Sequence, residues 1–98
     1  MALLSDADIE HALAELPGWT REGNAIRKQF TFGSFPEAVE FVSSLVPEAE
    51  AADHHPDLTI NYRRVTVAYS THSEGGLTPK DAAGARMAEA KAGDLKAR

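Results

Sequence analysis

The sequence contains no cysteine among its 98 residues. Disulfides, zinc sites built on sulfur and cysteine nucleophiles are therefore excluded. No segment approaches the roughly 18 to 20 apolar residues of a membrane-spanning helix. The N-terminal stretch MALLSDADIE reaches acidic residues without the basic flank of a secretory signal. From these absences we expect a cytoplasmic protein that does not enter a membrane.

Basic charge is scarce and scattered, with 10 Lys and Arg against 15 Asp and Glu and a formal net charge of −5. Binding to a phosphate backbone needs a basic stripe or patch, so we expect no nucleic-acid partner. The apolar fraction of 43% and the charged fraction of 26% are ordinary for a globular protein. We expect one domain over residues 1–98, with a frayed tail at 93–98.

The first third of the chain has the signals of a helix followed by a hairpin. Ser5 and Asp8 resemble a capping box before apolar residues at helical spacing, which predicts a first helix that ends at residues 17–18. A turn at 22–24 and alternating apolar and polar residues over 26–32 predict a hairpin with one solvent-exposed face.

The remaining chain repeats this order. Ser34 and Glu37, in capping relation, predict a second helix, and Pro47 inside it predicts a bend or a disturbed last turn. Alternation over 58–70 predicts a second hairpin, and TPKD at 78–81 opens a third, alanine-rich helix.

The resulting order is αββαββα, which predicts an α+β fold. Its four strands would form one antiparallel sheet with the helices packed on one face. The other face then needs polar cover or a partner, and half-buried strands leave association between subunits open.

Three of the four histidines, His54, His55 and His72, lie at the ends of predicted elements. The start of one strand and the end of its hairpin neighbour meet at the same edge of a sheet, so we expect these residues to converge. Imidazole titrates near neutrality and can both donate and accept a proton. Nearby carboxylates, such as Glu50 and Asp53, would orient the rings. This pattern favours acid–base chemistry such as the elimination or addition of water.

Each candidate residue also has a simpler interpretation. A histidine near a helix end can be a solvated group that interacts with the helix dipole. Asp81 can be the reciprocal half of a capping box with Thr78, and this role can coexist with a functional one. Glu50 can be a surface acid and Trp19 a core residue, while His11 is expected to face solvent.

A zinc site is a less favoured alternative. Three histidines and an acid could hold zinc tetrahedrally. The helical H-x-x-x-H spacing is missing, however, and adjacent histidines on an extended backbone point in opposite directions. We therefore expect no metal.

The pattern around these histidines resembles that of the pterin-4a-carbinolamine dehydratase family. The family pattern is an acid, three residues, His-His-Pro, five or six residues, an aromatic, nine residues, a histidine, and a short spacer to an aspartate. This chain reads, in order, Glu50, AAD, His54-His55-Pro56, DLTIN, Tyr62, nine residues, His72, SEGGLTPK and Asp81. The segments Gly18-Trp19, IRKQFTFGSF and Ser70-Thr71-His72 are also similar to the family, so the likeness spans nearly the whole chain.

The resemblance implies the family's reaction, in which a 4a-hydroxytetrahydropterin such as 4a-hydroxytetrahydrobiopterin loses water to give quinonoid dihydropterin. This reaction supports aromatic amino-acid hydroxylation and requires no metal or organic cofactor. By resemblance, the acid–base residues are His54, His55 and His72, with His55 and His72 as the preferred pair and the donor and acceptor unassigned.

The resemblance also assigns supporting residues. Those that would orient the imidazoles are Glu50, Asp53 and Asp81, and those that would bind the pterin edge are Ser70 and Thr71. Two positions depart from the family, because animal members carry tryptophan where this chain has Leu58 and arginine where it has Lys80. Both changes could alter how substrate packs.

The expected partners are the pterin substrate and further copies of the chain, as a homodimer or homotetramer, with a functional link to an aromatic amino-acid hydroxylase. Vertebrate members also dimerise a homeodomain transcription factor, and nothing in this sequence supports that role. The alternative function is a non-catalytic scaffold that keeps the fold and acts through protein contacts.

Overall fold

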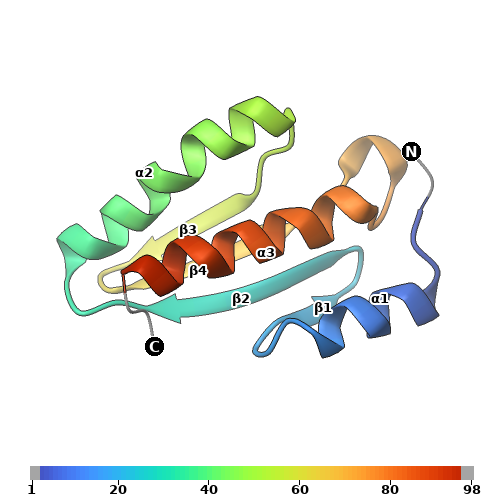
Figure 1. Cartoon of the computed structure of the whole chain (residues 1–98), viewed down its shortest axis with the longest axis horizontal. Helices are drawn as coiled ribbons and strands as arrows, with labels where there is room; N and C mark the ends of the chain where they lie inside the picture. The colour runs from blue at the N-terminus through green and yellow to red at the C-terminus, as the bar shows by residue number, and fades with distance from the viewer. Residues whose placement is uncertain (1–2, 96–98) are drawn as a thin grey trace.

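The computed structural model describes residues 3–95 and has the predicted order of elements (Figure 1). The elements are α1 (Asp6–Ala14), β1 (Thr20–Glu22), β2 (Ala25–Thr31), α2 (Phe35–Ala52), β3 (Asp57–Asn61), β4 (Arg64–Tyr69), a short 3₁₀ helix η1 (His72–Glu74) and α3 (Pro79–Asp94). The strands form one antiparallel sheet in the order β1-β2-β4-β3. Helices α2 and α3 lie over one face of it (Figure 1), so the predicted α+β fold is confirmed.

The strand register separates an apolar face from a polar one. Ile26 lies opposite Tyr69, and Phe30 lies opposite Val65; all four are buried. The positions between them carry polar or small side chains on the opposite face, among them Arg27, Gln29, Thr59, Asn61 and Thr66. Polar side chains therefore cover the face that the helices leave free.

Side-chain caps begin the helices as predicted. Ser5 Oγ accepts a hydrogen bond from the N–H of Asp8 at 3.1 Å, and Ser34 Oγ accepts one from the N–H of Glu37 at 3.3 Å. A capping box opens α3. Each cap satisfies a backbone donor that has no partner inside the helix.

Of the helix ends, that of α1 differs from the prediction. Helix α1 ends at Ala14, before residues 17–18, because the N–H groups of Glu15 and Leu16 bond to carbonyls only three residues back and tighten the last turn. Helix α2 includes Pro47, as predicted, although proline supplies no N–H to it, and the bend expected there stays a prediction. Helix α3 extends to Asp94, and the fraying expected over 93–98 stays a prediction, because residues 96–98 lie outside the described part of the chain.

The core is an aromatic cluster on the covered face of the sheet. Phe41 of α2 packs against Phe30 and Phe32, with ring centroids 5.2 and 4.9 Å apart. Trp19 meets Phe30 edge to face at 6.1 Å, and its indole N–H donates to Glu89 Oε1 of α3 at 2.8 Å. Trp19 is thus a core residue that also ties α3 to the sheet.

Gly84 allows α3 to approach Tyr69 closely. A Cβ atom at Gly84 would lie 2.5 Å from Tyr69 Cε1. Only 1% of Tyr69 is exposed, and its hydroxyl has no hydrogen-bond partner within the described residues. Burial, and then the negative charge of Asp81, raise the pKa of Tyr69 to about 12.

We expect Gly84→Ala to lower the free energy of unfolding by about 1 to 3 kcal/mol, because the Tyr69 ring must shift to admit the methyl group. Gly93→Ala in the same helix is the matched control, since a Cβ there meets nothing within 4 Å. Gly93→Ala should raise the free energy of unfolding by no more than about 1 kcal/mol. Urea denaturation at equal protein concentration measures both, and equal stabilities would contradict the close approach.

The raised pKa of Tyr69 predicts a loss of stability at alkaline pH. The phenol of the unfolded chain ionises near pH 10, whereas that of the folded chain ionises at about 12. The stabilisation is therefore fully present below about pH 10 and is lost between about pH 10 and 12, by roughly 3 kcal/mol. Denaturation curves give the free energy of unfolding of the native chain and of Tyr69→Phe at each pH. The difference between the two free energies should change by roughly 3 kcal/mol from about pH 10 to 12. Parallel pH dependences of the two proteins would contradict this prediction.

Candidate active site

His54 is held by a buried carboxylate. Its Nε2 lies 2.6 Å from Oδ1 of Asp81, which is completely buried. Oδ2 of Asp81 accepts hydrogen bonds from the hydroxyl of Thr71 at 2.8 Å and from the backbone N–H of Thr78 at 2.9 Å. An ionised carboxylate only accepts, so Nε2–H of His54 is the donor. Nδ1 is the ring nitrogen left without a partner within residues 3–95.

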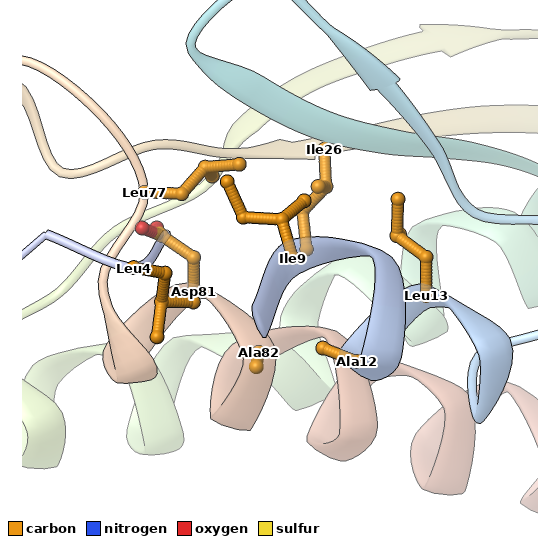
Figure 2. Close-up of a pocket in the computed structure, with 8 residues that line it drawn as sticks. All are labelled: Leu4, Ile9, Ala12, Leu13, Ile26, Leu77, Asp81 and Ala82. Atoms are coloured by element: carbon orange, nitrogen blue, oxygen red, sulfur yellow. The ribbon is translucent and has the colours of Figure 1, made fainter. Parts of the chain in front are cut away.

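Helix α1 shields Asp81 from solvent. Asp81 borders a small apolar cavity of about 10 Å³, and half of the residues that line it belong to α1 and the segment before it. Figure 2 shows the carboxylate among the side chains of Leu4, Ile9 and Leu77. Its hydrogen bonds to the protein therefore replace those that water would provide.

A residue in the left-handed conformation at the end of α2 precedes the two adjacent histidines. Asp53, with φ of 50°, is the C-cap, and the N–H of His54 bonds to the carbonyl of Ala49. Asp53 contributes this backbone conformation, because its carboxylate makes no hydrogen bond or ion pair within the described residues. The chain then extends into β3.

His55 pairs with the other predicted acid. Its Nε2 lies 2.5 Å from Oε2 of Glu50, and the two side chains are 55% and 69% exposed. The ring borders a mainly apolar cavity of about 120 Å³ between Leu58 and α2. The carboxylate orients this imidazole at the surface, where solvent screens their interaction.

His72 begins η1 and is exposed, with no hydrogen bond or ion pair to its ring within residues 3–95. It lines a cavity of about 250 Å³ with Asn24, Asp57 and Ser70. Thr71 points to the other side of the sheet, where its hydroxyl contacts Asp81 and, at 2.8 Å, Thr78 Oγ1. Of the two residues predicted to bind substrate, only Ser70 therefore lines this cavity.

The three histidines lie at the same end of the sheet but line different cavities. Asp57 at the start of β3 pairs with Ala68 near the end of β4, which brings the flanking segments together. The end of α2, η1 and the start of α3 gather at the same end of the molecule (Figure 1). His54, however, lies beside Tyr69, His55 beside Leu58, and His72 beside Ser70.

Two residues of this region were not among the predicted site residues. Thr78 was expected only to cap α3, and Tyr69 only to alternate in its strand. The Tyr69 ring stacks on His54, with centroids 5.9 Å apart and planes at 21°. The two-residue period of β4 places Tyr69 and Thr71 on one side of the sheet, and this signal could have identified Tyr69.

Residues 3–95 do not present the donor geometry of a zinc site. Within the described part of the chain, no three His, Cys, Asp or Glu side chains are placed to hold a metal ion. His54 and His55 instead contact two different carboxylates. Among residues 3–95, no helix is both long enough and apolar enough to cross a membrane.

Sequence comparisons place the chain among known proteins. The family model described as pterin 4 alpha carbinolamine dehydratase matches residues 2–91. A Roseiflexus castenholzii protein named "Putative pterin-4-alpha-carbinolamine dehydratase" is 58% identical over 80 residues, which cover 82% of this chain and 86% of that protein. A Mycobacteroides abscessus protein of the same name is 50% identical over 93 residues, 95% of this chain and 99% of that protein.

Two solved structures share the fold. A transcriptional coactivator/pterin dehydratase from Brucella melitensis superimposes with a TM-score of 0.90 at 36% identity, over 93% of this chain and 99% of that chain. A pterin dehydratase-like protein described as a RuBisCO assembly factor in the alpha-carboxysome has a TM-score of 0.64 at 22% identity, over 76% and 87%, and shows the fold alone. With the family model matching nearly its whole length, the chain belongs to the pterin-4a-carbinolamine dehydratase family.

Proposed function

We propose that the protein dehydrates 4a-hydroxytetrahydrobiopterin, or a related 4a-hydroxytetrahydropterin, to quinonoid dihydropterin. It would act in the cytoplasm and recycle the pterin used by an aromatic amino-acid hydroxylase. The observation that carries this proposal is that His54, His55 and His72 lie at the same end of the sheet in a chain of this family.

The reaction needs one proton donor and one proton acceptor. The C4a–O bond breaks as the hydroxyl receives a proton and leaves as water, while N5 loses its proton and forms a double bond to C4a. Each proton transfer of this type contributes roughly 10²- to 10⁴-fold. One histidine gives a proton and another takes one, so the pair together gains none.

The histidines differ in how they are prepared for these steps. His54 and His55 each direct Nε2 at a carboxylate, which fixes the ring and leaves Nδ1 as the acceptor of the neutral imidazole. His72 has both ring nitrogens free of partners within residues 3–95 and lies beside polar groups of Ser70 and Asp57. The cavity of about 250 Å³ next to His72 is our proposed site for the polar pterin ring.

We expect His55→Ala and His72→Ala each to lower turnover at least tenfold, because each removes a proposed proton carrier. His11→Ala is the matched control, since this side chain is 82% exposed on α1 and far in sequence from the site. Stopped-flow absorbance with freshly generated 4a-hydroxytetrahydrobiopterin measures the rate, and circular dichroism verifies the fold. Unchanged turnover in both folded variants would favour the scaffold function.

We further propose that the protein forms a homodimer or homotetramer. Helix α2 exposes an apolar stripe at helical spacing, formed by Phe35, Val39 and Val46. Beside it, the edge strand β3 and the following turn expose Leu58, Ile60 and Tyr62. An edge strand has free backbone groups, so a second copy related by a two-fold axis can pair with it and cover the apolar side chains.

Sedimentation equilibrium tests this association. Val46→Glu should weaken it at least tenfold, because a charge would be buried in the apolar contact. Ala51→Glu is the control, since it adds the same charge at an exposed position of α2 outside the stripe. A native chain that stays monomeric at micromolar concentration, or equal weakening by both changes, would contradict this interface.

A further inference from the structure

The apolar cavity beside His55 lies at the free edge of the sheet. Its walls come from α2 and from the segment that leads into β3, which is the edge strand. Val46 and Leu58 line it and are both exposed. The side chains of His55 and Glu50, which also line it, pair in an exposed position. A single chain therefore leaves this cavity and a proposed proton carrier open to water.

The free edge of β3 offers the backbone groups of two residues. A two-residue turn at 62–63 joins β3 to β4, and Asn61 lies opposite Arg64. The pair of residues that closes such a turn is hydrogen-bonded, and along the strand alternate residues bond to the same neighbour. The N–H and C=O groups of Leu58 and Ile60 therefore point away from β4, toward the edge.

These free groups restrict how a second copy can pair across a two-fold axis. Two antiparallel β3 strands overlap over all five residues when the axis passes at Thr59. Leu58 then lies opposite the partner's Ile60, and their free backbone groups face each other. Both side chains lie on the face that the helices cover, as do their neighbours in β4, Val67 and Val65. The apolar side chains of the two copies therefore meet beside the cavity.

The same register brings the turn of the partner to the start of β3. The partner's Tyr62 comes opposite Pro56, which lines the cavity next to His55. Within its own chain Tyr62 is exposed and has a φ of 55°, which is uncommon for a bulky residue. Arg63 lies over this ring, with Cζ 5.4 Å from the centroid. The partner's Arg63 would bring a positive charge toward the exposed carboxylate of Glu50, so the charges favour a second copy at this edge.

We propose that a second copy completes the site at His55, and that the partner's Tyr62 closes the cavity beside the imidazole. Tyr62 is a positioning residue in this arrangement. It excludes water from the pair of His55 and Glu50, and their hydrogen bond is stronger where solvent does not screen it. The inference rests on the proposed association and dehydration, and it adds that each site uses residues of two chains.

Mixed dimers test whether Tyr62 acts on the other chain. Tyr62→Asn removes the ring, and asparagine tolerates a positive φ. We expect this variant, like His55→Ala, to lower turnover at least tenfold, because the imidazole is no longer held in place. Equal amounts of the two variants are refolded together from urea. Each mixed dimer then has one complete site, and half of the dimers are mixed, so turnover should recover to about a quarter of the native value.

The matched control is a mixture of His55→Ala and His72→Ala. Both residues belong to the same chain's site, so a mixed dimer has no complete site and turnover should not recover. Tyr62→Phe keeps the ring and should restore turnover without mixing. Equal recovery in the two mixtures, or no recovery with Tyr62→Asn, would overturn the proposal.

A second measurement does not need turnover. The His55 ring signals of a histidine-labelled Tyr62→Asn chain are recorded by NMR, alone and with an excess of unlabelled native chain. The partner's Tyr62 should return these signals to their positions in the native protein. Signals that stay as in Tyr62→Asn alone would refute the shared site. Native signals without turnover in the native protein would refute the dehydration and leave the shared site standing.

Discussion

The buried carboxylate of Asp81 is the interaction on which the arrangement of the site depends. A carboxylate with no exposure would be strongly destabilising without donors, because it has lost its hydration. Its donors come from three parts of the chain: His54 from the segment between α2 and β3, Thr71 from the end of β4, and Thr78 from the start of α3. These three segments cannot move apart without leaving a buried charge unsatisfied.

The two roles considered for Asp81 coexist in one geometry. Oδ2 accepts the backbone N–H of Thr78, as a capping box requires, and the same oxygen accepts the Thr71 hydroxyl. Oδ1 remains for the imidazole of His54. A carboxylate that only capped α3 would use one oxygen and lie at the surface. Here helix α1 covers the Asp81 carboxylate, and its second oxygen orients a candidate acid–base residue.

Local signals in the sequence were sufficient to predict the fold. Serine and threonine caps mark the helix starts, and two-residue alternation marks the sides of the strands. The same signals predict that His54 and His55 point in opposite directions, but they do not predict which cavity each histidine lines. Which cavity a histidine lines depends on tertiary packing, such as the close approach of α3 to Tyr69 at Gly84 beside His54. The resemblance predicts that Thr71 binds substrate, and this stays a prediction; its position two residues after Tyr69 places its side chain on the side of the sheet that holds Asp81.

The Asp81 network also links His54 to His72, although these residues face different cavities. Thr71 directly precedes His72, and its side chain is held by Asp81 and Thr78. Its backbone N–H bonds to the carbonyl of Gly76, and the N–H of Gly75 bonds to the carbonyl of His72, which closes the turn around η1. The carboxylate that orients the imidazole of His54 therefore also anchors the backbone from which His72 projects. Two of the three candidate acid–base residues thus share one anchor, so their relative placement depends on the hydrogen bonds of Asp81.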